Sequence, residues 1–137
     1  MSPPISNFLD HVRDWVAHQP TIAAVALVGS HARGEARPDS DIDLVLLCED
    51  PHAFVAHTSW IHSFGAVGRC HTEDWGMVTS LRVYYTEGLE VEFGMTTLAW
   101  AAVPADSGTR HVVAQGMCIL WDREGVLARL HEAVSTS

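Results

Sequence analysis

Lysine does not occur in this chain of 137 residues, and all eight of its basic residues are arginine. Walker-type P-loops, protein kinases and pyridoxal phosphate enzymes each depend on a particular lysine. The sequence therefore excludes these three classes. Basic residues are also few relative to acidic ones, and the net charge of −9 argues against binding nucleic acid through its phosphates, which requires a basic surface.

Cysteines and long apolar runs are scarce as well. The three cysteines lie far apart and form no C-x-x-C pair. This argues against a disulfide framework or a structural zinc site and favours a reducing, cytoplasmic environment. The longest apolar run, residues 22–28, is far shorter than the ~20 residues of a membrane helix. The first residues contain no basic segment followed by an apolar stretch, so we expect no secretory signal and no membrane partner.

The composition is that of a globular protein, 47% hydrophobic and 18% charged, and its length suits a single domain over residues 1–137. Apolar residues at helical spacing predict a helix from Ile5 to Val16. Strands are predicted over residues 21–28, 41–48, 75–85, 89–96 and 118–121, helices over 51–64, 109–114 and 123–134, a short helical turn or loop over 30–36, and a loop over 65–74. This order predicts an α/β (α+β) fold, with a mixed β-sheet flanked by helices.

Two acidic strands carry the strongest candidate chemistry. Asp41 and Asp43 are two residues apart on a predicted strand, so their side chains point to the same face, with Cα atoms ~6.5 to 7 Å apart. Like charges so close need a cation or a proton, and carboxylate oxygens suit Mg²⁺. On a later strand, Glu90 and Glu92 alternate with apolar residues and share the face opposite to them. A third carboxylate from this strand can complete a two-metal site.

A Gly-Ser turn follows the buried strand over residues 21–28. Glycine lets the backbone approach a ligand closely, while the Ser30 hydroxyl and the N–H groups at a helix start can hold phosphate oxygens, which makes Gly29 and Ser30 candidates for nucleotide binding. Arg33, between this turn and the acidic pair, is either a phosphate contact or a solvated arginine. Trp75 or Trp100 could stack on a base, although a buried or rim position is more common for tryptophan.

The segment from Leu27 to Leu44 resembles the signature of the DNA polymerase beta nucleotidyltransferase superfamily. Its features are an apolar strand, Gly-Ser, about ten residues containing Ala-Arg-Gly, and an acid-apolar-acid strand. The nearest relatives by appearance are the minimal nucleotidyltransferases and the catalytic halves of aminoglycoside adenylyltransferases. The resemblance implies that Gly29 and Ser30 hold the β- and γ-phosphates and that Asp41 and Asp43 bind two Mg²⁺ ions. The third acid, Glu92 with Glu90 as the fallback, would bind one metal and help to deprotonate an acceptor hydroxyl.

The implied reaction is Mg²⁺-dependent transfer of a nucleoside monophosphate, most simply AMP from ATP, to a hydroxyl acceptor. Relatives usually carry a further helical domain that shapes the acceptor site, whereas few residues follow Thr96 here. We therefore expect the missing wall to come from a second copy, as a homodimer, or from a helical partner protein. Two alternatives stay open: an antitoxin-like minimal transferase that acts on such a helical partner, and a nucleotide-binding module that keeps the fold without catalytic turnover.

Overall fold

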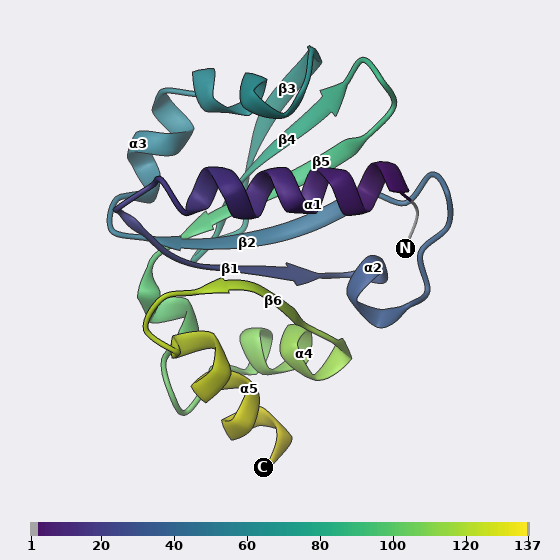
Figure 1. Ribbon diagram of the computed structural model, residues 1–137. Coiled ribbons are helices and arrows are strands. Elements are labelled where there is room, and N and C mark those ends of the chain that lie inside the picture. The colour runs from purple at the N-terminus through teal and green to yellow at the C-terminus, as the bar shows by residue number, and fades with distance from the viewer. Residues whose placement is uncertain (1–2, 137) are drawn as a thin grey trace.

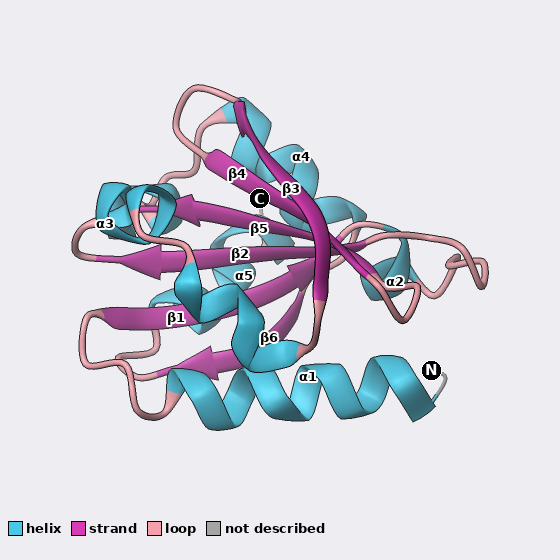
Figure 2. Cartoon of the chain, turned by 90° about the horizontal axis from the view of Figure 1, so that it is seen from above, coloured by secondary structure: helices cyan, strands magenta, loops and turns pink. Residues whose placement is uncertain are grey.

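A six-stranded sheet forms the centre of the molecule, in a computed structural model that describes residues 3–136. The strand order is β3-β4-β5-β2-β1-β6. Neighbouring strands run antiparallel except β2 and β5, which are parallel. The mixed sheet with helices on both faces is the fold class that the sequence predicts, and it is shown in Figures 1 and 2.

The elements follow one another along the chain in this order: α1 (Pro3–Val16), β1 (Ile22–Val28), α2 (Ser30–Arg33), β2 (Ile42–Cys48), α3 (Pro51–Ala56), the 3₁₀ helix η1 (Ser59–Phe64), β3 (Val67–Asp74), β4 (Thr79–Tyr85), β5 (Glu90–Thr96), the 3₁₀ helix η2 (Leu98–Ala101), α4 (Ser107–Gln115), β6 (Cys118–Asp122) and α5 (Val126–Ser135). Within residues 3–136, none of the helices has the length and apolar character that crossing a bilayer requires.

Hydrophobic residues fill both faces of the sheet. On one face, the apolar stripe of α1 packs on the strands; Phe8 is 3% exposed and its ring lies 6.2 Å from that of Phe93 on β5. On the other face, η2, α4 and α5 cover the sheet, and Leu127 and Leu130 of α5 cluster with Val45 of β2. In Figure 1, α4 and α5 lie below β6, away from α1 and α3. Side chains on a strand alternate between faces, so this layering decides which residues can reach a site.

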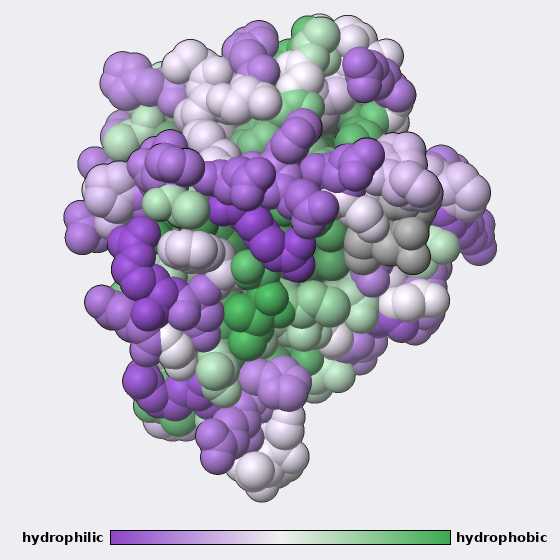
Figure 3. Space-filling view, viewed as in Figure 1, coloured by the Kyte–Doolittle hydropathy of each residue, from purple (hydrophilic) through white to green (hydrophobic). Residues whose placement is uncertain are grey.

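The surface seen in Figure 3 is largely hydrophilic, and a hydrophobic area lies over β6 between α1 and the C-terminal helices. The sheet has two edge strands, β3 and β6. Most of the side chains of β3 are exposed. Charged and polar side chains on an edge strand oppose pairing with another chain, and β3 carries Arg69, His71, Glu73 and Asp74.

The prediction of a loop over residues 65–74 is wrong, because most of this segment is β3. An exposed edge strand has no buried face, so its sequence lacks the apolar alternation that identifies a strand, and only its pairing with β4 defines it. Two boundaries also differ. The helix predicted over residues 51–64 divides into α3 and η1, and β4 begins at Thr79, after a turn in which the Gly76 N–H donates to Asp74 Oδ1.

Candidate active site

Strand register brings the three predicted acids together. In the parallel pair, Asp43 of β2 lies directly beside Glu92 of β5, and Ile42 lies beside Val91. The apolar pair is fully buried on the α1 side, so the acids point to the opposite face. Asp41, one residue before β2, completes the group. One ligand oxygen from each of Asp41, Asp43 and Glu92 lies within 4.8 Å of the others. We refer to these three residues as the acidic trio.

Gly29 brings the backbone of the Gly-Ser turn against this trio. Its φ of +75° is one that glycine adopts without a steric penalty, and a Cβ at this position would collide with Asp43 Oδ2. Val28, the preceding residue, pairs with Asp43 across β1 and β2. The turn then starts the short helix α2 at Ser30. The structure therefore places Gly29 and Ser30 beside the acids, as the signature implies.

The loop between α2 and β2 is tied down by short polar contacts. His31 Nε2 donates to the carbonyl oxygen of Ser40 at 3.2 Å, and the Arg37 N–H donates to the Ser40 hydroxyl at 2.8 Å. Both contacts fix the residue that precedes Asp41. Arg33 forms a long ion pair with Glu35, at 3.6 Å, and its side chain is 31% exposed. In this arrangement Arg33 is paired along its own loop.

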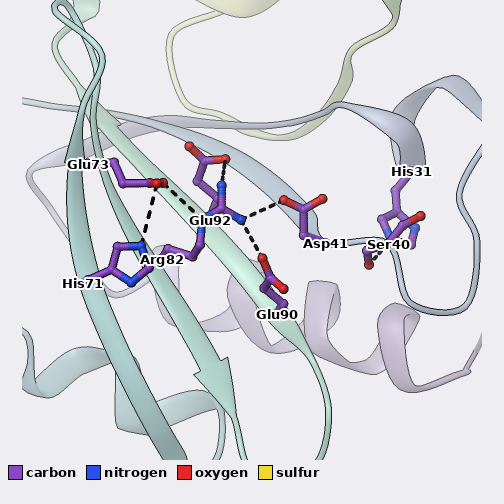
Figure 4. A network of polar contacts seen from close by, with 8 residues as sticks. All are labelled: His31, Ser40, Asp41, His71, Glu73, Arg82, Glu90 and Glu92. Carbon is purple, nitrogen blue, oxygen red and sulfur yellow. Dashed lines mark hydrogen bonds and ion pairs between the residues drawn. The ribbon is translucent and has the colours of Figure 1, made fainter.

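Arg82, in the middle of β4, is a residue for which the sequence suggested no role. Its guanidinium donates to Asp41, Glu73, Glu90 and Glu92 over distances from 2.7 to 3.1 Å. Figure 4 shows these carboxylates arranged around Arg82. Burial alone would lower the pKa of Arg82. The neighbouring carboxylates have the larger effect, so the pKa lies above the ordinary value for arginine. Glu90, the fallback for the third acid, contacts Arg82 and is not in the acidic trio.

The surroundings of Asp43 disfavour its charged form. Burial and the neighbouring charges of Asp41 and Glu92 raise its pKa from 3.8 to about 8. Its Oδ1 is buried and accepts no hydrogen bond from the described residues. A buried carboxylate oxygen without a donor is costly unless a cation or proton reaches it. Three converging carboxylates with one such oxygen are a donor set suited to a hard divalent cation such as Mg²⁺.

The raised pKa makes the metal-free stability depend on pH. The folded chain keeps the Asp43 proton between pH 3.8 and about 8, where the unfolded chain has lost it, so the stability contributed by this group falls as pH rises through that interval. We expect Asp43→Asn to melt roughly 3 to 8 °C higher than the parent near pH 9 in chelator, and to melt at the same temperature near pH 4. Thermal melts followed by circular dichroism measure both; a constant difference across this range would contradict the assignment.

A cavity of about 320 Å³ adjoins the trio on the face covered by η2 and α4. Asp43 and Glu92 form part of its wall, with Ser80 of β4, and the rest is mainly apolar: Val28, Leu44, Val45, Trp75, Val78, Gly94, Trp100 and Val112. Trp100 is 5% exposed, whereas Trp75 is 63% exposed. None of the lining residues, all within residues 3–136, is basic. The cavity can therefore receive an uncharged group next to two carboxylates.

Sequence reasoning found the trio and the Gly-Ser turn but missed Arg82 and Glu73. Arg82 shares the period-two pattern of its strand, in which Leu81 and Val83 are buried and Arg82 points away from them. That pattern places it on the face opposite to the apolar core, as for Glu92 on the next strand, and could have identified it. Glu73 lies on β3, which was predicted as a loop, so no face could be assigned to it.

Comparison with known proteins gives one family match. The family model described as "Nucleotidyltransferase domain" matches residues 7–82, more than half of the chain. The matched stretch includes the Gly-Ser turn and both aspartates of the trio, and it ends ten residues before Glu92. The family match therefore does not include the proposed third acid. Among curated proteins, none matches the sequence.

Three solved structures illustrate the similarity in fold. The aminoglycoside 6-adenyltransferase from Bacillus subtilis superposes with a TM-score of 0.55 at 16% identity, over 69% of this chain and 35% of that one. A CCA-adding enzyme gives 0.54 at 17%, over 96% and 32%. A chain of a toxin–antitoxin complex with AMP-PNP gives 0.51 at 14%, over 93% and 84%. At these identities the likeness concerns the fold, and this chain spans about a third of the length of the first two.

Proposed function

Since this chain belongs to the nucleotidyltransferase domain family, we propose that it catalyses divalent-metal-dependent transfer of a nucleoside monophosphate, AMP from ATP in the simplest case, to a hydroxyl group. The family match confirms both the resemblance and the class of enzyme that the signature predicts. The observation that supports the detailed proposal is the convergence of three carboxylates beside a glycine turn, with one buried oxygen of Asp43 lacking a donor.

Each residue at the site has a role in this proposal. The trio would hold two Mg²⁺ ions, which supply electrostatic stabilisation of the phosphate charge that develops during transfer. The backbone at Gly29 and the hydroxyl of Ser30 bind the terminal phosphates, because the turn lies against Asp43 and has no side chain in the way. Glu92 is also the group that takes the proton of the acceptor hydroxyl, since it adjoins the cavity.

The cavity beside Glu92 is the proposed acceptor site. In phosphoryl transfer, the attacking and leaving oxygens lie roughly in line, so the acceptor enters opposite the pyrophosphate. The strand order places Gly29, after β1, on one side of the trio and Ser80, on β4, on the other. The strands contribute lining residues from β1, β2, β4 and β5, so the cavity extends from Val28, next to the phosphate turn, to Ser80 on the side away from that turn. Its apolar walls and the two carboxylates favour an uncharged acceptor over an anionic one.

Transfer of label from α-phosphate-labelled ATP tests the proposal directly. The chain is incubated with Mg²⁺ and labelled ATP, alone and with cell extract, and the products are separated by size. Labelled product other than AMP, together with pyrophosphate release, is the expected result. Nucleotide binding without pyrophosphate release under all conditions would instead identify a binding module that keeps the fold without turnover.

A second candidate is a minimal transferase that acts on a partner protein, as in an antitoxin-like role. It is favoured by the likeness to a chain of a toxin–antitoxin complex, which is similar in fold over 84% of that chain. The same labelling experiment separates the two candidates. A labelled small molecule supports a small acceptor, and a labelled protein band that resists ribonuclease supports a protein acceptor.

Trp75 offers a test of the acceptor cavity that leaves the core untouched. We expect Trp75→Ala to lower the transfer rate at limiting acceptor concentration by roughly three- to ten-fold, because it removes an aromatic wall of the cavity. The melting temperature should not change, since this side chain is 63% exposed. The matched control is Ile119→Ala, which shortens an exposed hydrophobic side chain on a different element, β6. If Trp75→Ala weakens stabilisation by Mg-ATP instead, the cavity binds the nucleotide base.

A further inference from the structure

Arg82 contacts more carboxylates than a simple surface ion pair requires. Two of its partners, Asp41 and Glu92, belong to the acidic trio, and two, Glu73 and Glu90, do not. Its side chain is only 16% exposed. The guanidinium is therefore anchored from β3 and β5 while it reaches across to the residue that precedes β2, as Figure 4 shows.

In the metal-free chain, Arg82 offsets part of the negative charge at this end of the sheet. Five carboxylates meet at this end of the sheet: the trio, Glu73 and Glu90. Arg82 is the cation that contacts four of them, and Asp43 is left without a donor for Oδ1. With all five ionised, four negative charges remain after Arg82 is counted, which two divalent cations would balance. Arg82 thus already contacts two of the three carboxylates that a metal would use.

We propose that Arg82 is a built-in counter-cation of the acidic trio, which competes with divalent metal for Asp41 and Glu92. The inference rests on the proposed function, because it assigns the trio to metal. The guanidinium holds one oxygen of each acid and places a positive charge beside the position that the trio surrounds. A nearby like charge disfavours a bound cation, so metal binding to the free chain is weakened. Glu73 and Glu90, which lie outside the trio, hold Arg82 by two further ion pairs.

The alternative is that Arg82 only orients the two acids, in which case its removal would weaken metal binding. The two roles differ in the sign of the effect. Charge repulsion of a divalent ion at this range outweighs the loss of orientation, because Asp43 and Glu92 are already fixed by strand register. We therefore expect metal affinity to rise when the guanidinium is removed.

The test measures Mn²⁺ binding by electron paramagnetic resonance, without nucleotide. Arg82→Met removes the charge, and Arg82→Gln removes it while keeping hydrogen-bond donors, so that at least one variant remains folded by circular dichroism. Both should bind Mn²⁺ about ten-fold more tightly than the parent. Arg82→Lys, which keeps the charge, should stay close to the parent. The matched control is Arg69→Met on the adjacent strand, where the guanidinium stacks on Tyr84 at 4.1 Å and the global charge changes equally.

The outcomes separate this inference from the proposed function. Unchanged or weaker Mn²⁺ binding in the Arg82 variants, with the parent still binding, overturns the counter-cation role and leaves the metal site standing. Equal tightening in Arg69→Met reduces the effect to overall charge and also overturns it. Absence of Mn²⁺ binding in the parent and in all variants contradicts the assignment of the trio to metal, and with it the proposed function.

Discussion

Asp43→Asn is expected to reduce nucleotide transfer by at least ~10³-fold while the chain remains folded, and Asp41→Asn should have a similar effect. Both carboxylates belong to the trio proposed to hold the metal ions, and Asp43 contributes the buried oxygen that lacks a donor. In metal-free solution the Asp43 variant should be as stable as the parent or more so, because the substitution relieves repulsion between like charges. Initial rates with labelled ATP and thermal melts measure the two effects.

Asp39→Asn is the matched control for these substitutions, since it makes the same chemical change two residues before Asp41 at an exposed position. It should retain the parent rate. Stabilisation by Mg-ATP provides an independent readout: it should be lost in both trio variants and kept in the control. Unchanged stabilisation in both Asp41→Asn and Asp43→Asn would mean that metal and nucleotide bind elsewhere.

Glu92→Gln should lower the transfer rate by ~10²-fold or more, whereas Glu90→Gln should change it by less than about five-fold. The two substitutions are chemically identical, and each removes the negative charge of one carboxylate that accepts a hydrogen bond from Arg82. They differ in position, because Glu92 lies beside Asp43 in register and adjoins the cavity, while Glu90 lies outside the trio. The comparison of initial rates therefore isolates the third acid.

The reverse order of effects, with Glu90→Gln the slower enzyme, would transfer the role of the third acid to Glu90. Equal losses in both variants would mean that the reaction depends on the charge of the whole cluster. Melting temperatures of the two variants should agree within a few degrees, since both glutamates are partly exposed and contact the same guanidinium.

Much of the site could be predicted because its information is local. The alternation around Asp41 and Asp43, and around Glu90 and Glu92, fixes the face of each strand before any partner is known. Gly29 follows an apolar strand in a short signature, so the turn was also recognisable. The choice of Glu92 over Glu90 depended on the family resemblance and stays a prediction; the register of β2 with β5 places Glu92 beside Asp43.

The strand pattern gives the face of Arg82, but its ion-pair partners could not be predicted because they depend on contacts between distant segments. Arg82 meets Asp41 across 41 positions of sequence and Glu73 from a strand without an apolar face. The end of α3 at Ala56 is another case, since the following 3₁₀ helix is held by tertiary contacts: the ring of Trp60 stacks on that of Trp15 of α1, with 5.2 Å between centroids. The apolar residues of this segment fit a single helix equally well.

The parallel pairing of β2 and β5 has a consequence for how this gene can change length. Asp43 and Glu92 lie side by side only because of the register between the two strands. A shift of that register by one residue reverses the direction of every side chain that follows. An insertion or deletion of a single codon at the start of β5 would turn Glu92 toward α1 and bring its apolar neighbour to the site. Changes by two codons preserve the parity. The turn before β5 can therefore change in length only if the side chains of β5 keep their directions relative to β2.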